Sequence, residues 1–239
     1  MRKFLFLLCL LPSIGISQTK NVMYVERITP KADKIAEFEK AIAAHAQKYH
    51  TGDWKWRVSQ VQTGPDAGSY VIVEGPSSWT DQDTRGDLGA EHTADWNKLF
   101  GTTTTGKIEA MAMVYRADLS SGQLTDFAEK NAITHVYPRI GFGGKVEANL
   151  RKAKKVWDAS GQTVIVYESS SSGEPQFIVV YRYKTGWKER ETSFRKPFTE
   201  RYNETYGPNS YDEYLETIQR FTSRVWSEMI LYRADLSSK

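Results

Sequence analysis

Apolar residues recur along this chain with two different spacings. In residues 31–50 and 145–160 they repeat at three- and four-residue steps, the spacing of one buried helix face. In shorter runs, such as 22–28 and 70–73, apolar and β-branched residues follow one another directly, which is typical of strands. Read in order, each half of the chain predicts strand, helix, strand, strand, helix, strand.

The expected elements can be placed by their start and stop signals. Thr29 and Pro30 suit the beginning of the first helix, and Gly52 suits its end. Ser210 and Glu213 have the spacing of a capping box at the start of the last helix. The remaining expectations are strands at 54–58, 108–115, 133–140, 163–167, 176–183 and 228–232 and a short helix at 96–100 in an otherwise irregular segment.

One seven-residue sequence, Tyr-Arg-Ala-Asp-Leu-Ser-Ser, occurs twice, at 115–121 and again at 232–238. Each copy ends a segment of similar length, so the sequence predicts a tandem duplication of one domain. We expect a signal segment at 1–17, a first repeat at 19–122, a linker at 123–131 and a second repeat at 132–239. Continued along a strand, the motif would place Arg116 and Asp118 on one face, tying strand ends together at the junction of the repeats.

The strands at 70–73, 164–166 and 177–181 are apolar at both odd and even positions. An antiparallel sheet with one solvated face would alternate instead, so both faces of these sheets must be covered. Helices can cover one face, and the sheet of the other repeat is the simplest cover for the other. The predicted fold class is therefore α+β, with two tandem ferredoxin-like β-α-β-β-α-β repeats whose antiparallel sheets pack into one pseudo-dimeric α/β barrel.

This order of elements, the Thr29-Pro30 helix start and the tandem duplication resemble the dimeric α/β-barrel superfamily, which includes antibiotic-biosynthesis monooxygenase-like, haem-degrading and NIPSNAP-like proteins. The resemblance covers nearly all of the chain after residue 17. It implies a closed barrel and a pocket between each sheet and its helices. Haem-degrading members carry an asparagine on their first strand, where this chain has Glu26-Arg27 and Pro138-Arg139. The sequence therefore departs from the haem-degrading pattern.

The N-terminal residues resemble a secretory signal, with Arg2 and Lys3 before an apolar core and a small-x-small site at Gly15 to Ser17. We expect a periplasmic or secreted protein that begins near Gln18 and has no stable membrane insertion. Removing Arg2 and Lys3 lowers the formal charge from +3 to +1, which gives no support to nucleic-acid binding. The single cysteine, Cys9, would be lost as well, which excludes thiol chemistry in the exported chain.

Aromatic and histidine side chains on the predicted sheets and helices supply the candidate ligand site. His45 lies on the apolar face of the first helix. Three roles are compatible with this position: a general base, a haem ligand or a hydrogen-bonded core residue. Alignment of Lys40-Ala41 with Lys152-Ala153 gives it Trp157 as its counterpart, so no paired site results. Tyrosines need a hydroxyl partner when they are buried and could line a pocket. The expected ligand-binding residues are His45, Trp56, Tyr70, Trp157, Tyr167, Tyr181 and Tyr183.

No metal or cofactor motif is complete. Asp81, Asp83, Gly86 and Asp87 have part of the spacing of a calcium loop, but Arg85 and His92 occupy two ligand positions. The glycine-rich stretch at 141–145 lacks the phosphate-loop pattern. We therefore expect no metal and no cofactor.

Three functions are compatible with these residues. The first is binding of a small apolar or aromatic ligand between sheet and helices, by a monomer with an internal pseudo-dimer. The second is a cofactor-independent monooxygenase-like enzyme, and the third is a non-catalytic interaction module with no cavity. Binding is favoured because no acid, base or nucleophile pair stands out, and a fold alone does not license a reaction.

Overall fold

The structure is a computed structural model that describes residues 19–239. The expected signal segment and Cys9 lie outside the described residues. The first repeat contains β1 (Val22–Pro30), α1 (Ile35–Tyr49), β2 (Trp56–Val61), β3 (Tyr70–Ser77), α2 (Trp79–Thr84), α3 (Ala90–Thr103) and β4 (Thr104–Tyr115). The second contains β5 (Lys130–Pro138), α4 (Gly143–Ala159), β6 (Val164–Ser169), β7 (Phe177–Tyr183), α5 (Phe198–Tyr206), α6 (Ser210–Phe221) and β8 (Thr222–Tyr232).

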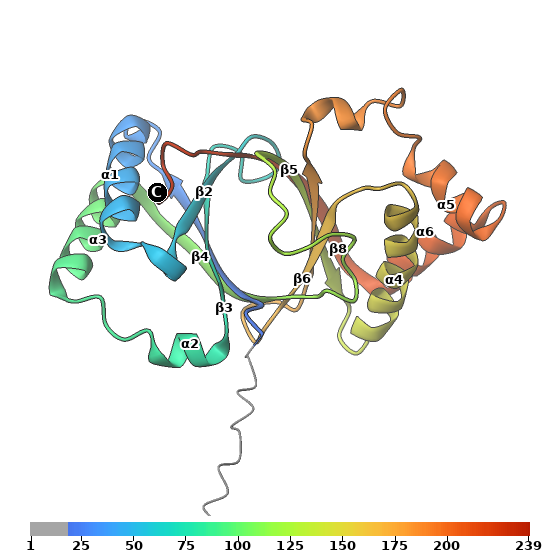
Figure 1. Ribbon diagram of the computed structural model, residues 1–239, viewed down its shortest axis with the longest axis horizontal. Helices are drawn as coiled ribbons and strands as arrows, with labels where there is room; N and C mark the ends of the chain where they lie inside the picture. Colours follow the sequence, from blue (N-terminus) through green and yellow to red (C-terminus); the bar gives the residue numbers. More distant parts are fainter. Residues whose placement is uncertain (1–18) are drawn as a thin grey trace, which may run out of the picture.

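The eight strands form one closed antiparallel barrel in the order β1-β3-β2-β8-β5-β7-β6-β4. The two four-stranded sheets meet where β2 pairs with β8 and where β4 pairs with β6. Helices α1 to α3 cover one side of the barrel and α4 to α6 the other (Figure 1). The predicted pseudo-dimeric barrel is therefore confirmed. None of the helices within residues 19–239 combines the length and the apolar character that crossing a bilayer requires.

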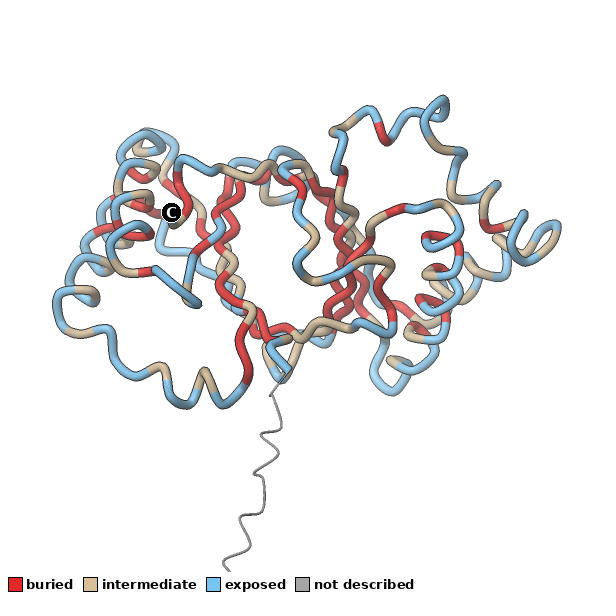
Figure 2. Tube along the Cα trace, in the orientation of Figure 1, coloured by how far each residue is buried: buried red, intermediate tan, exposed pale blue. Residues whose placement is uncertain are grey.

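Three apolar cores explain why the strands are apolar on both faces. One lies inside the barrel and contains Met113, Ile165 and Ile178. The other two lie between each sheet and its helices, around Phe38 in the first repeat and Leu150 in the second. Buried residues accordingly run along the barrel strands and the inward faces of α1 and α4 (Figure 2).

Several helix boundaries differ from the predictions. Pro30 ends β1, where a proline without an N–H is tolerated, and α1 begins only at Ile35 without a side-chain cap. Asn209 precedes α6 in a left-handed conformation, so Ser210 and Glu213 form no capping box. A capping box does occur between Ser78 and Asp81 at the start of α2.

Several elements are longer than predicted, as β3, β4 and β8 are, or are absent from the predictions, as α2 and α5 are. Helix α3 extends over the segment read as irregular, and its first turn follows Gly89, whose φ of 91° suits glycine. Helix α5 was not predicted at all. Strand β8 begins at Thr222 rather than at Glu228 because polar residues face solvent along its first half.

The repeated heptads leave their strands and form turns, so the predicted alternation of faces past Tyr115 and Tyr232 is wrong. In both copies the leucine N–H donates to the carbonyl of the arginine, at 3.1 Å for Leu119 and for Leu236. Each turn then enters the other repeat. Leu119 is fully buried in the helix-side core of the second repeat, and Leu236 is buried in that of the first.

Backbone bonds fix these exchanged turns in the same way at both ends. Arg116 N–H donates to Val166 O and Arg233 N–H donates to Val58 O, each at 2.9 Å. In return, the N–H groups of Val166 and Val58 donate to the hydroxyls of the heptad serines at 2.9 Å. The predicted location of the motif at the junction of the repeats is correct.

Candidate functional site

A cavity of about 330 Å³ lies inside the barrel rather than between a sheet and its helices. Every strand except β6 contributes alternate side chains to it, because successive residues of a strand point to opposite faces. On β1, for example, Met23, Val25 and Arg27 point inward. The walls are mostly apolar and consist of Met23, Val25, Val71, Val73, Met111, Met113, Ile133, Ile178, Val180 and Ile230. Strand β6 contributes only Tyr167.

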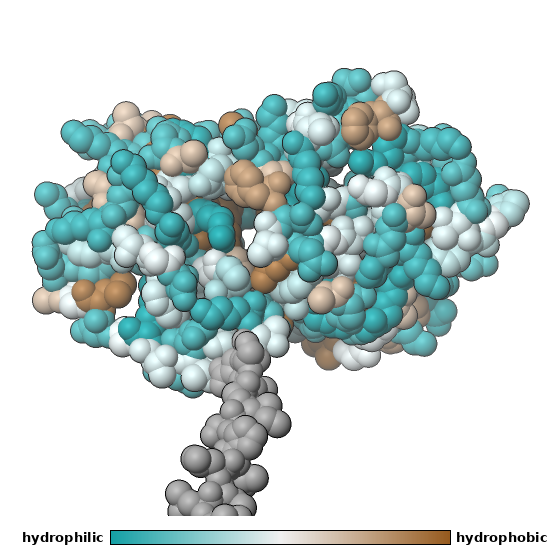
Figure 3. All heavy atoms as spheres, viewed as in Figure 1, coloured by the Kyte–Doolittle hydropathy of each residue, from teal (hydrophilic) through white to brown (hydrophobic). Residues whose placement is uncertain are grey.

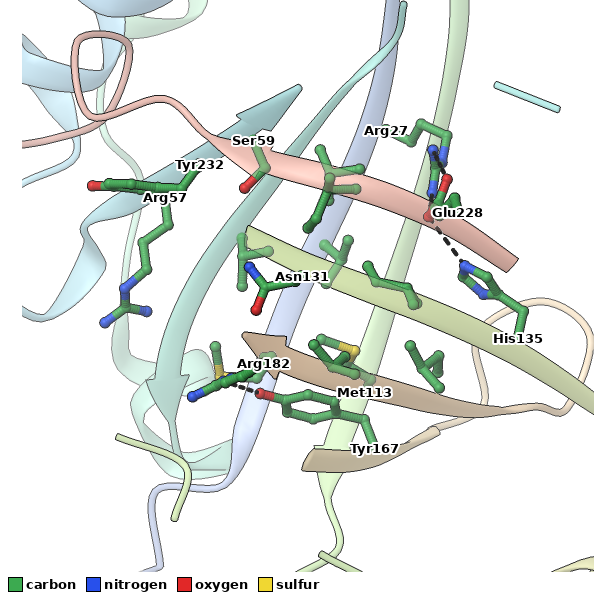
Figure 4. A pocket seen from close by; sticks show the side chains of 18 of the residues that line it. Arg27, Arg57, Ser59, Met113, Asn131, His135, Tyr167, Arg182, Glu228 and Tyr232 are labelled. Carbon is green, nitrogen blue, oxygen red and sulfur yellow. Dashed lines mark hydrogen bonds and ion pairs between the residues drawn. The ribbon is translucent and has the colours of Figure 1, made fainter. Parts of the chain in front are cut away.

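A buried ionic network occupies one end of the cavity (Figure 4). Arg27 from β1 donates two hydrogen bonds to the Glu228 carboxylate of β8, at 2.9 and 2.5 Å. His135 from β5 lies 3.2 Å from the same carboxylate through Nε2, and its Nδ1 is 2.9 Å from Gln176 Oε1. Trp226 stacks on the His135 ring at 4.1 Å. One repeat thus supplies the cation and the other the anion.

Glu228 is charged in this setting because its partners outweigh its burial. The side chain is fully buried, and burial alone would raise its pKa. Hydrogen bonds from His135 and Arg27, together with the positive charge of Arg27, lower the pKa of Glu228 below its ordinary value. The positive charge of Arg27 and the negative charge of Glu228 therefore cancel, which leaves little net charge at this end of the cavity.

Two further arginines, Arg57 of β2 and Arg182 of β7, line the cavity without a carboxylate partner among residues 19–239. Arg57 donates to the Gly75 carbonyl at 2.8 Å, and Arg182 donates to the Leu124 carbonyl at 3.3 Å and to the Tyr167 hydroxyl at 3.4 Å. Burial raises the pKa of Tyr167, although the charges of Arg182 and Arg57 oppose the rise. Asp126 also lines the cavity, but its carboxylate bonds Lys184 at 2.8 Å rather than either arginine. The two arginines therefore leave this end with an excess of positive charge.

The segment between the repeats contributes to the cavity wall. Residues 124–128 line it, and in Figure 1 the connection from β4 to β5 crosses the view of the barrel interior. Phe127 is half exposed and packs edge-on against Tyr232 at 5.0 Å. Apolar side chains show at a hollow between the two halves in the space-filling view (Figure 3). The expected linker is therefore part of the site.

Of the seven residues predicted to bind ligand, only Tyr167 lines this cavity. Trp56 and Tyr70 belong to the helix-side core of the first repeat, and Trp157 and Tyr181 pack in that of the second. Tyr183 packs on Trp187 outside the barrel. The prediction of a pocket between sheet and helices differs from the cavity found, because the helix-side layers are filled by these large side chains.

Hydrogen bonds in these layers account for several of the predicted residues. Tyr70 donates to Glu39 at 2.5 Å, and Trp56 Nε1–H donates to Glu74 at 3.0 Å. Trp157 and Tyr181 contact each other edge to face at 6.0 Å. These partners explain why the side chains are fixed in the cores.

His45 lies in the first-repeat layer beside two histidines that the sequence did not connect with it, His50 and His92. Burial lowers the pKa of all three, and at His45 and His50 the nearby carboxylates oppose the shift. The neutral imidazole is therefore the favoured form of each.

The surroundings of His45 do not fit a haem group. Four rings, those of His50, Trp56, His92 and Trp96, have centroids 5.2, 5.3, 4.9 and 5.4 Å from the His45 centroid. A macrocycle could reach His45 Nε2 only by displacing this packed cluster. Glu26 and Arg27, on the strand where haem-degrading proteins carry asparagine, point to opposite faces of the sheet.

Comparison with known proteins adds information on fold but not on family. No family model matches the sequence, and no curated protein matches it. An anthrone oxidase-like protein superposes with a TM-score of 0.61 at 11% identity, covering 90% of this chain and 92% of that one.

Two other solved structures are similar over comparable lengths. A proposed monooxygenase from Fusobacterium nucleatum has a TM-score of 0.55 at 10% identity, covering 88% of this chain and 91% of that one. A chlorite dismutase from Candidatus Nitrospira defluvii has a TM-score of 0.52 at 7% identity, covering 92% and 93%. The chain therefore has the fold of the dimeric α/β-barrel superfamily, with both ferredoxin-like units supplied by one polypeptide.

Proposed function

We propose that this protein is exported and binds a small, mostly apolar molecule with one acidic group inside its barrel. The observation that carries this proposal is the pair Arg57 and Arg182, which line an apolar cavity without a carboxylate partner among residues 19–239. A charge in an apolar setting is stabilised by an opposite charge, so a carboxylate or phenolate ligand fits this end. The apolar walls would hold an aromatic or aliphatic body.

The size of the cavity agrees with such a ligand. A volume of about 330 Å³ is at the lower end of the range of small-molecule sites, roughly 300 to 1,000 Å³. Tyr167 and Asn131 place neutral polar groups beside the arginines, which would help to orient the acidic group. A pure interaction module is disfavoured because it requires no such cavity.

The test compares an aromatic acid with its neutral amide. We expect 2-naphthoate to bind in isothermal titration calorimetry and 2-naphthamide to bind at least tenfold more weakly. Arg182→Met should weaken 2-naphthoate binding by about 10- to 100-fold, the equivalent of about 1.5–3 kcal/mol for a hydrogen bond to a charged group. Arg220→Met, an exposed arginine of α6, removes the same charge outside the barrel and should leave binding unchanged.

Equal affinity for the acid and the amide would refute the role of the arginines. Absence of binding of either probe, in a protein whose circular dichroism shows it folded, would refute the cavity as a binding site for such molecules.

A second candidate function is oxidation of the bound aromatic molecule by oxygen without a cofactor. The fold shared with a proposed monooxygenase and an anthrone oxidase-like protein favours it. A phenolate held between Arg57 and Arg182 would be the electron-rich form that reacts with oxygen. Oxygen uptake with anthrone as the probe, compared between the wild type and Arg182→Met, would separate this function from binding alone.

Export is tested by the mass of the protein recovered from its own host. Cleavage after Ser17 should give a chain that begins near Gln18 and lacks Cys9. Recovery of the full chain from the cytoplasm would refute the export part of the proposal and leave ligand binding untouched.

A further inference from the structure

Three histidines from separate positions in the first repeat come together beneath its helices. His45 lies on the buried face of α1, His50 follows the last turn of α1, and His92 lies in the first turn of α3. One nitrogen from each ring lies within 4.8 Å of the others. The ring centroids are 4.9 to 5.4 Å apart. These are three of the four histidines in the sequence.

The Nε2 atoms of all three rings are buried and have no hydrogen-bond partner among residues 19–239. Burying a polar atom without a partner costs about 1–3 kcal/mol. Native structures leave few such atoms, and each one calls for an explanation such as an ion or a water molecule. Three unpartnered nitrogens in one small volume indicate a shared partner.

The opposite nitrogens of two rings are held by carboxylates. His45 Nδ1 lies 2.7 Å from Asp95 Oδ2, and His50 Nδ1 lies 3.2 Å from Glu74 Oε2. An ionised carboxylate only accepts hydrogen bonds, so Nδ1 of each ring carries the proton. Each Nε2 is therefore left with a free lone pair. A carboxylate on the far nitrogen is the arrangement that orients metal-binding histidines in proteins.

Glu74 is itself fixed in place. It accepts a hydrogen bond from Trp56 Nε1 at 3.0 Å and from Arg85 at 2.6 Å. The Trp56 ring stacks on His50 at 3.6 Å and holds its plane. This support would keep the His50 lone pair directed at the cluster whether or not a metal is bound.

We propose that His45, His50 and His92 bind one divalent transition-metal ion through their Nε2 atoms, with Zn²⁺ as the favoured occupant. Imidazole nitrogens suit zinc, whereas calcium and magnesium prefer oxygen ligands. Zinc–nitrogen bonds of about 2.0–2.1 Å in a tetrahedral site place ligand atoms about 3.3 Å apart. One nitrogen of each ring lies within 4.8 Å of the others, so small shifts of the rings would bring the three Nε2 atoms to this spacing.

The site would keep one position open. Three protein ligands and an exchangeable fourth position are typical of catalytic rather than structural zinc sites. His92 is only half buried, which leaves one side of the cluster near solvent. The site is separate from the barrel cavity, because none of the three histidines lines that cavity.

The test begins with chelator-treated protein and Zn²⁺ alone. We expect one Zn²⁺ per chain to remain after gel filtration, as measured by elemental analysis, and a rise in the thermal midpoint with added Zn²⁺. Asp95→Asn should weaken Zn²⁺ binding by about 10- to 100-fold because it removes the carboxylate behind His45. His92→Gln, which removes a ligand, should weaken binding by more than about 100-fold.

His135→Gln is the matched control, since it removes the fourth histidine from the barrel and should leave the Zn²⁺ stoichiometry at one. Circular dichroism of each metal-free variant shows whether it is folded, and Asp95→Asn changes a half-exposed side chain. Wild-type protein that retains no Zn²⁺ would overturn the proposal. Retention by His92→Gln that equals the wild type would overturn it as well.

Discussion

The layer between sheet and helices has an apolar core in both repeats, but a cluster of buried histidines adjoins this core in the first repeat, where the second has aromatic rings. In the first, His45, His50 and His92 meet beneath α1 and α3. In the second, Trp157, Tyr181 and the rings of α5 and α6 fill the same layer. The seven buried side-chain atoms of residues 19–239 that lack a hydrogen-bond partner follow this division, because only Trp157 Nε1 belongs to the second repeat.

This difference indicates that the helix-side layers of the two repeats have different roles. Both copies keep the barrel strands and the heptads, whereas in the described residues only the first has a histidine cluster in its helix-side layer. The second layer contributes packing.

The largest expected effect contrasts the two layers directly. Trp157→Ala should destabilise the protein by about 3–5 kcal/mol, because it empties a fully buried volume in the aromatic layer. His45→Leu in metal-free protein should change stability by less than about 1 kcal/mol, since it removes an unpartnered nitrogen and leaves Asp95 solvated. Urea unfolding measures both. Equal losses would show that both layers serve packing alone.

Leu119 and Leu236, which each pack into the core of the other repeat, test whether the two heptads still have the same structural role. Leu119→Ala and Leu236→Ala should each cost about 2–5 kcal/mol, because each leucine fills the helix-side core of the other repeat. We expect the two losses to agree within about 1 kcal/mol, the scatter of such measurements between similar sites. A large loss in one variant and none in the other would show that one heptad has lost its structural duty.

Acid should weaken the contact that joins the repeats inside the barrel. The folded-state pKa of Glu228 is lowered, so its contribution to stability is present above the unfolded-state pKa and is lost as pH falls through the folded-state pKa. The side chains that face it are those of Arg27 and His135. We expect the unfolding free energy of the wild type to fall more steeply below about pH 4.3 than that of Glu228→Gln. Parallel curves would show that another carboxylate controls acid unfolding.

The smallest expected effect concerns the heptad arginines. Arg116 bonds Asp118, Glu147 and Glu168, and Arg233 bonds Asp235 and Glu39. These groups are partly exposed, so Arg116→Ala and Arg233→Ala should each cost about 1 kcal/mol or less. Binding of 2-naphthoate should be unchanged. Loss of binding with retained stability would identify the heptad as a site.

The sequence allowed the fold to be predicted because the duplication and the two-sided apolar strands restrict the architecture. The same strands hid the cavity, since apolar residues at both parities do not show which face is the barrel interior. Charged residues inside strands do not identify the interior face either. Arg27 and Glu228 point into the barrel, whereas Glu26 and Glu74 point toward the helices.

The histidine cluster could not be predicted because it depends on how α3 packs against α1. Residues 90–103 are polar and begin without a side-chain cap, so His92 was assigned to an irregular segment. His45 and His50 alone are too common a pattern to indicate a metal site. The contact between the helices, rather than any spacing along the chain, brings the third ring to the other two.

The exchange of Leu236 into the first repeat has a consequence for synthesis. A ribosome makes the strands and helices of residues 19–115 long before it reaches the residue that completes their core. The barrel also stays open until residues 230–232 pair with β2. Contacts between positions so distant in sequence form slowly and leave apolar surface exposed in the meantime. We therefore expect the first half to stay incompletely packed during synthesis until the heptad at 232–238 has been made.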